Sequence, residues 1–155
     1  MGVSGTGKST VGEALAAELG LPFVEGDDLH PEANTRKMAA GIPLTDDDRA
    51  PWLDAVAAEL SRPVVVSCSA LKRAYRDRLR AAAPHLALVY LHGDPALLAA
   101  RMTGRPDHFM PPELLESQLA TIEPPGPDEG PIDVDVTAAP DEIVAFVATR
   151  LREDA

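Results

Sequence analysis

The sequence predicts an α/β domain, a parallel sheet with helices on both faces. Two observations predict this class. Short runs of apolar, often β-branched residues alternate along the chain with longer stretches in which apolar residues recur every three or four positions. Polar and acidic residues follow directly after several of the apolar runs, where the strands of a parallel sheet would end. Ligands of such sheets bind at the carboxyl ends of the strands, so we expect the functional site there.

Size and composition fit one folded domain spanning residues 1–155. Hydrophobic residues make up 45% of the chain and charged residues 25%, which argues against disorder and against a membrane protein. The formal net charge of -11 has the wrong sign for binding nucleic acid or anionic lipid, so we expect neither partner. Cys68 is the only cysteine, which excludes an internal disulfide and fits a reducing compartment. With no targeting leader or long apolar run, the expected location is the cytoplasm.

The first predicted helix begins near Lys8 and ends at Leu19. Val11, Leu15 and Leu19 are spaced by four residues, and Gly20 follows as a stop signal. The next 40 or so residues hold one strand and two helices. The strand is the apolar run 21–24, and the helices are a short one from Pro31 through 40 and a longer one that begins at the acidic residues 46–48 and continues to 60.

The second half of the chain repeats the same alternation. Its predicted strands are 64–66, 86–91 and 132–136, and its predicted helices are 71–83, 96–102, 113–121 and 141–151. A polar segment bracketed by prolines, about 104–112, is predicted to be a short lid. The Pro- and Gly-rich stretch 124–131 is predicted to be a connection without regular structure.

The strongest motif lies at the start of the chain. It has a glycine, four residues, then Gly-Lys-Ser, the pattern of a loop that binds phosphate. Backbone N–H groups of such a loop surround phosphate oxygens, and the following helix adds its positive N-terminal end. Lys8 can reach the outer phosphates and Ser9 can hold Mg²⁺. The predicted ATP-binding residues of this loop are Gly2, Val3, Ser4, Gly5, Thr6, Gly7, Lys8, Ser9 and Thr10.

A phosphate loop normally follows a buried central strand, but only Met1 precedes Gly2 here. Without that strand, two rows of backbone hydrogen-bonding groups in the sheet would lack partners. We therefore expect the natural polypeptide to begin upstream, with several apolar residues that form a first strand ending at Met1.

The residues after the predicted strand 21–24 suggest a kinase. The guanine-reading Asn-Lys-x-Asp sequence of GTPase switches is absent. Glu25 and Asp27 stand where a small kinase would meet the hydroxyl group that accepts the phosphate. Phosphoryl transfer needs positioning, charge neutralisation and a carboxylate that orients or deprotonates the nucleophile, and Asp27 is the candidate for that role. The alternative is that Asp27 only caps the turn that follows it.

Several specific segments follow one another along the chain. They are the phosphate loop, Gly26-Asp27-Asp28-Leu29-His30-Pro31, Pro43-Leu44-Thr45-Asp46-Asp47-Asp48-Arg49, Cys68-Ser69-Ala70-Leu71-Lys72, His108-Phe109-Met110 and Ser117-Gln118. In this order they resemble the bacterial gluconate kinases, and the resemblance covers nearly the whole chain. It implies a P-loop fold similar to shikimate and nucleoside monophosphate kinases, transfer of the ATP γ-phosphate to the 6-hydroxyl of D-gluconate with Mg²⁺, and a homodimer. Glu25 stands where the family usually has Asp.

Gluconate carries hydroxyls and one carboxylate, so its pocket should combine hydrogen-bond acceptors with a cation. Asp27 and His30 are the predicted acceptors. Lys72 and Arg76, one helical turn apart, are the predicted cations, the alternative being that they belong to a solvated basic helix face. Arg49 is a further candidate, which either faces the pocket or pairs with the neighbouring acids, themselves expected mainly to serve the helix N-terminus.

The lid supplies the last candidates. Arg101 and Arg105 flank the polar segment, and lid arginines of similar kinases close on the transferring phosphate. Arg105 is therefore predicted to be catalytic and Arg101 to contact ATP, although Arg101 also fits a plain exposed helix residue. His108 resembles a lid residue that touches substrate. Two other functions stay open: a kinase for shikimate or another sugar acid, and a nucleotide-binding regulatory domain without catalysis.

Overall fold

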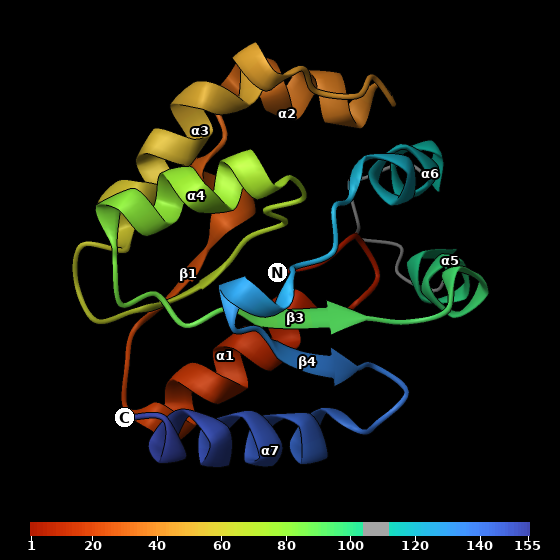
Figure 1. The fold of residues 1–155 in the computed structure, drawn as a ribbon. Helices are drawn as coiled ribbons and strands as arrows, with labels where there is room; N and C mark the ends of the chain where they lie inside the picture. The colour runs from red at the N-terminus through yellow and green to blue at the C-terminus, as the bar shows by residue number, and fades with distance from the viewer. Residues whose placement is uncertain (104–111) are drawn as a thin grey trace.

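The computed structural model describes residues 1–103 and 112–155 (Figure 1). Its four strands form two parallel pairs, in which Phe23 lies opposite Val65 and Val89 opposite Ile132. The strands are β1 (Phe23–Glu25), β2 (Val65–Ser67), β3 (Val89–His92) and β4 (Ile132–Asp135). Each lies within one or two residues of a predicted strand, except that β3 begins later than the apolar run 86–91.

The helices also follow the prediction. They are α1 (Lys8–Leu19), α2 (Glu32–Ala39), α3 (Asp46–Glu59), α4 (Arg73–Ala82), α5 (Pro95–Thr103), α6 (Pro112–Thr121) and α7 (Pro140–Glu153). Two short 3₁₀ turns were not predicted. The first, η1 (Gly26–Leu29), follows β1, and the second, η2 (Pro127–Glu129), lies inside the stretch expected to lack regular structure. In η2 the carboxylate of Glu129 accepts a hydrogen bond from the Gly126 N–H, which closes the turn.

Helices cover both sides of the strands, as predicted. In Figure 1, α1 and α7 lie on one side and α3 and α4 on the other, and each of these helices packs against its neighbour. The core is divided accordingly. Val11 and Leu15 of α1 pack with Val147 of α7 in one cluster, whereas Trp52 and Leu79 belong to a second cluster between α3 and α4. Burial of these two apolar faces is the main force that holds the layers together.

One of the three acids 46–48 caps the N-terminus of α3. The Thr45 hydroxyl accepts a hydrogen bond from the Asp48 N–H, and the Asp48 carboxylate accepts one from the Thr45 N–H, a reciprocal cap. The expectation that these acids serve the helix N-terminus is thus confirmed for Asp48. Within the described part of the chain, no helix has the length and apolar character needed to cross a membrane.

Candidate active site

The phosphate loop occupies residues 2–7, directly before α1. Gly5 and Gly7 have left-handed backbone angles, with φ of 84° and 86°, which glycine adopts without strain. A Cβ atom on Gly5 would lie 2.7 Å from the Leu98 carbonyl oxygen, so the loop packs directly on α5. A Cβ atom on Gly7 would meet nothing within 4 Å. The loop therefore packs against α5 on one side and is open in front of the α1 N-terminus. An anion-binding loop needs this open side, where its N–H groups can reach the anion.

Two side chains of the loop turn back onto its own backbone. The Thr6 hydroxyl donates to the Val3 carbonyl at 2.8 Å, and the Lys8 ammonium donates to the same carbonyl at 3.0 Å. Lys8 also lines a small cavity next to the loop. Phosphate groups bound by the loop would lie in front of the loop. These contacts keep the lysine charge at the loop, where it can neutralise phosphate oxygens.

Ser9 and Glu25 form the part of the site that fits a magnesium ion. The Ser9 hydroxyl donates a hydrogen bond to one oxygen of the Glu25 carboxylate, and the Ser67 hydroxyl donates to the other at 2.5 Å. A hydroxyl beside a carboxylate offers the oxygen ligands that Mg²⁺ prefers, the remaining ligands being water and phosphate. In the described ranges no three His, Cys, Asp or Glu side chains gather at one point that could hold a metal ion.

Beyond the phosphate loop lies a cavity of about 30 Å³, which has room for about one water molecule. Its lining joins the loop, η1, α3 and α6. The residues are Ser4, Lys8, Asp27, His30, Met38, Pro43, Leu44, Arg49, Trp52, Ser69, Leu114, Ser117 and Gln118. Three predicted substrate residues, Asp27, His30 and Arg49, therefore meet here. The side chain that caps η1 belongs to Glu25, which accepts from the Asp27 N–H, so the Asp27 carboxylate is not needed for that role.

The imidazole of His30 is fixed from two directions. It stacks on the Trp52 indole with ring centroids 4.4 Å apart, and the Asn34 amide nitrogen lies 3.2 Å from its Nδ1. Because an amide nitrogen donates, Nδ1 accepts and Nε2 carries the proton of the neutral ring. Burial, together with the charge of Arg49, lowers the pKa of His30 to about 4. The ring is thus neutral at pH 7. With Nδ1 engaged by Asn34, its Nε2 can donate a hydrogen bond to a hydroxyl group but cannot accept one, so the predicted acceptor role does not fit His30.

Arg49 lines the cavity, and its contact with substrate stays a prediction. Its Nη1 donates to the Leu44 carbonyl at 2.9 Å and to the Tyr75 hydroxyl at 3.1 Å. Two of the three neighbouring acids are paired with other cations: Lys37 binds Asp48 and Lys72 binds Asp46. A guanidinium fixed by neutral partners keeps its charge available for an anionic ligand.

The prediction that Arg76 contacts substrate is wrong. Its side chain is 1% exposed and forms a bidentate ion pair with Glu129, at 2.7 and 3.1 Å, while its Nη1 donates to the Ala70 carbonyl. The partner lies 53 positions further along the chain, so helix spacing could not reveal it. Lys72 does not line the small cavity; its ammonium is held 3.0 Å from Asp46, near the surface.

The remaining predicted residues belong to the lid region. The Arg101 guanidinium donates to the Val136 carbonyl at 2.7 Å, just after β4, and its contact with ATP stays a prediction. Arg105 and His108 lie outside the described residues. Cys68 is buried, and burial raises the pKa of its thiol to about 12, which agrees with a packing role rather than a nucleophilic one.

Sequence reasoning gave no role to two residues that shape the site. Gln118 of α6 accepts hydrogen bonds from Ser4 in the phosphate loop, and Asn34 connects His30 to α3 by donating to the Asp48 carbonyl at 2.8 Å. Gln118 is part of a segment on which the family resemblance rests, and that resemblance was the only signal for it. Nothing in the spacing of either residue points to its partner.

The chain was compared with known proteins. The family model described as shikimate kinase matches residues 4–122. A gluconokinase of Gluconobacter oxydans is 49% identical over 150 residues, which cover 93% of this chain and 84% of that protein. The thermoresistant gluconokinase of Escherichia coli is 47% identical over 135 residues, 83% of this chain and 77% of that protein.

Solved structures agree with these matches. A gluconokinase from Sinorhizobium meliloti superposes with a TM-score of 0.88 at 53% identity, covering 100% of this chain and 94% of that one. Shikimate kinase from Aquifex aeolicus, at 16% identity and a TM-score of 0.65 over 99% of this chain and 94% of that chain, shares the fold. The chain therefore belongs to the shikimate kinase family and, within it, groups with the gluconokinases.

Proposed function

We propose that this protein transfers the γ-phosphate of ATP to the 6-hydroxyl of D-gluconate. The observation that carries the proposal is the meeting of a phosphate loop with Asp27, His30 and Arg49 around one cavity, in a chain that matches gluconokinases at 49% identity over 93% of its length. The cavity offers a carboxylate for the reacting hydroxyl, a neutral imidazole for the polyol and a guanidinium for the acid group. Shikimate has no extended chain of hydroxyls to occupy such a set.

The phosphoryl transfer rests mainly on positioning and charge. The open face of the loop at Gly7 and the N-terminus of α1 receive the phosphate oxygens, and Lys8 neutralises their charge. Mg²⁺ would be held through Ser9 beside Glu25, and when bound it neutralises further charge on the phosphates. Asp27, in the same cavity as Lys8, orients the substrate hydroxyl and accepts its proton.

Gluconate is larger than the present cavity. A volume of about 30 Å³ suits one water molecule, so we infer that substrate binding separates the cavity walls. The α6 residues Leu114, Ser117 and Gln118 form one wall and directly follow the predicted lid segment. This wall would move outward to admit gluconate, and its return towards the bound substrate would exclude water from the transferring phosphate. We also propose a cytoplasmic location and a homodimer, the latter testable by light scattering on the purified protein.

ADP release from Mg·ATP tests the function. The purified protein is assayed with D-gluconate, with shikimate and without acceptor, and the product is identified by mass spectrometry as 6-phosphogluconate. Release that depends on gluconate supports the proposal, whereas release with shikimate alone would assign another kinase. Bound ATP without acceptor-dependent release would favour a regulatory nucleotide-binding domain. Lys8→Ala serves as the catalytic control and should reduce the rate by at least about 100-fold.

A further inference from the structure

One alanine beyond the end of β2 has a backbone conformation that alanine avoids. The φ angle of Ala70 is 46°, and among the described residues no other residue except glycine has a positive φ. In this left-handed region the Cβ atom lies too close to the following carbonyl oxygen. A residue other than glycine keeps such a conformation only where the surrounding structure holds it, and such residues cluster at functional sites. The contacts around Ala70 must therefore hold it in place.

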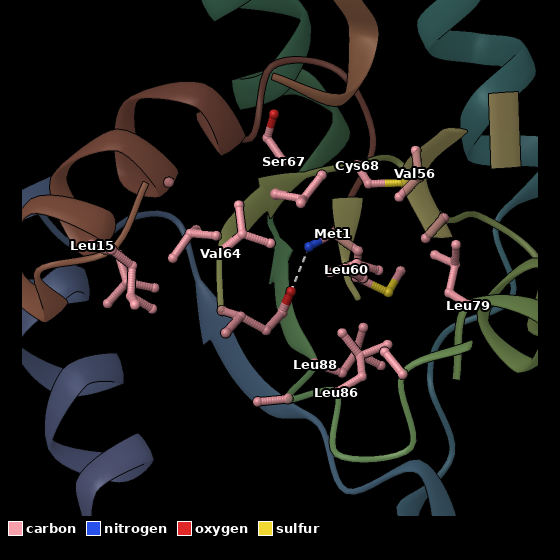
Figure 2. Close-up of a pocket in the computed structure, with 18 of the residues that line it drawn as sticks. Met1, Leu15, Val56, Leu60, Val64, Ser67, Cys68, Leu79, Leu86 and Leu88 are labelled. Carbon is pink, nitrogen blue, oxygen red and sulfur yellow. Dashed lines mark hydrogen bonds between the residues drawn. The ribbon is translucent and has the colours of Figure 1, made fainter. Parts of the chain in front are cut away.

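The methyl group of Ala70 is held by apolar packing. Ala70 is 3% exposed. It belongs to the apolar cluster that also contains Val56, Cys68 and Leu79. Figure 2 shows these three side chains along one side of an apolar cavity of about 670 Å³, which Ala70 also lines. Apolar packing has no directional preference, so it holds the methyl group without fixing the peptide groups on either side of Ala70.

The guanidinium of Arg76 supplies the directional contacts. Its Nη1 donates to the Ala70 carbonyl at 2.9 Å and to the Leu71 carbonyl at 3.3 Å. Its Nε and Nη2 donate to the two carboxylate oxygens of Glu129, at 2.7 and 3.1 Å. Because the guanidinium is planar and rigid, the bidentate pair with Glu129 fixes where Nη1 points. Arg76 therefore connects the η2 turn to the two carbonyls that follow β2.

The residue before Ala70 contacts both parts of the candidate active site. The Ser69 carbonyl accepts a hydrogen bond from the Gly2 N–H at 3.3 Å, at the start of the phosphate loop. Ser69 also lines the small cavity, together with Asp27. The Ser69 carbonyl belongs to the peptide group that precedes Ala70, so the φ angle of Ala70 sets its direction. A change in that angle would turn the carbonyl away from the phosphate loop.

We propose that Arg76 is a positioning residue for phosphoryl transfer, which holds the left-handed turn at Ala70 and so fixes the Ser69 carbonyl between the phosphate loop and the acceptor cavity. Arg76 acts through Ala70 and Ser69, and it does not itself line the small cavity. Its effect on turnover rests on the proposed kinase function. This role is separate from the ion pair, because neutralising Glu129 needs only a positive charge, whereas holding the turn needs the donors of Nη1.

Two substitutions separate these two roles. Arg76→Lys keeps a positive charge beside Glu129, but an ammonium lacks the fork that reaches the carboxylate and the carbonyls together. Glu129→Gln removes the charge of the carboxylate and keeps an oxygen that can accept from Arg76, so the Nη1 bonds remain. Rates are measured well below the urea midpoint of each variant. Arg76→Lys should lower kcat/KM for gluconate at least about tenfold, and Glu129→Gln less than about threefold. Equal losses in the two variants would overturn the proposal.

A glycine at position 70 provides a rescue test. Glycine adopts a φ of 46° without strain, so the turn then needs less support from Arg76. The double variant Arg76→Lys, Ala70→Gly should recover kcat/KM to within about threefold of Ala70→Gly alone. A purely stabilising role of Arg76 predicts no recovery, because the glycine removes a buried methyl group and adds freedom to the unfolded chain. A double variant as slow as Arg76→Lys would therefore overturn the proposal.

Binding of Mg·ADP, measured by calorimetry, is a readout that needs no acceptor. Because Ser69 holds the start of the phosphate loop, Arg76→Lys should raise the Kd for Mg·ADP at least about fivefold, and Glu129→Gln less than about twofold. A parent that releases no ADP with gluconate would contradict the proposed function, and the binding test of Arg76 would still apply. An unchanged Kd in Arg76→Lys would overturn the positioning role, whatever the acceptor assay shows.

Discussion

Gln118 accepts two hydrogen bonds from Ser4, one from the backbone N–H at 2.7 Å and one from the hydroxyl at 3.0 Å. The two residues are 114 positions apart, and the contact attaches α6 to the phosphate loop. Because α6 also forms one wall of the small cavity, this contact connects the nucleotide side of the site to the acceptor side. A movement of α6 that admits substrate would therefore also shift the phosphate loop or break these two hydrogen bonds.

Gln118→Leu should lower kcat/KM for ATP about tenfold, since it removes an acceptor from a largely buried N–H. Gln118→Glu keeps an accepting oxygen in place and should recover most of the loss. Steady-state kinetics with varied ATP measure the effect. Equal kinetics for the leucine variant and the parent would show that the contact does not position the loop.

The two cations near the acceptor site should behave differently. Arg49→Ala should raise the KM for gluconate about 30-fold and leave the KM for ATP nearly unchanged, because Arg49 lines the cavity and binds neutral partners. Lys72→Ala is the matched control and should change either KM less than about threefold, because its ammonium is paired with Asp46 near the surface. A larger effect at Lys72 than at Arg49 would reverse the assignment of the carboxylate contact.

Removal of one partner of the Arg76–Glu129 pair should destabilise the fold. The pair is buried, so Arg76→Met removes the bidentate partner of the Glu129 carboxylate and leaves it with the more distant Arg73 guanidinium at 3.8 Å. The variant should cost about 3 kcal/mol in urea unfolding. Arg36→Met, which breaks an exposed pair with Glu32, should cost less than about 0.5 kcal/mol. Similar unfolding midpoints for the two variants would contradict the structural role given to Arg76.

Acidic pH should weaken the protein through His30. Burial and Arg49 lower its folded pKa to about 4 from an ordinary 6.5. Between these values the unfolded state binds more protons, so the contribution of His30 is complete above pH 6.5 and disappears as the pH falls to about 4. We expect a loss of about 1–2 kcal/mol, below the full linkage value because part of the ring faces water.

Urea unfolding at pH 7 and pH 4.5 measures this loss, with His30→Gln as the comparison. Other titrating groups, the Met1 amine included, act in both proteins and cancel in the difference. The glutamine variant should lose less stability than the parent over this interval. Equal losses would show that His30 keeps its ordinary pKa in the folded state.

Local signals in the sequence determined the phosphate loop, the positions of the strands and helices, and the placement of Asp27 after a buried strand. Each depends on neighbours within a few positions: the glycine spacing before Lys8, the apolar periods, the acids at the start of α3. The family resemblance added the acceptor and singled out the segment that contains Gln118.

Only the tertiary structure decided which charges act in the site. Lys72 is the N-cap residue of α4 and Arg76 lies one turn further along the same helix. Arg76 is buried in an ion pair with Glu129, whereas Lys72 is held near the surface by Asp46. Two acids close to Arg49 in the sequence have other partners, because Lys37 binds Asp48 and Lys72 binds Asp46. Arg49 itself lines the cavity. The fold brings the partners of these ion pairs together from 11, 26 and 53 positions apart along the chain. Spacing along one helix carries no information about such partners.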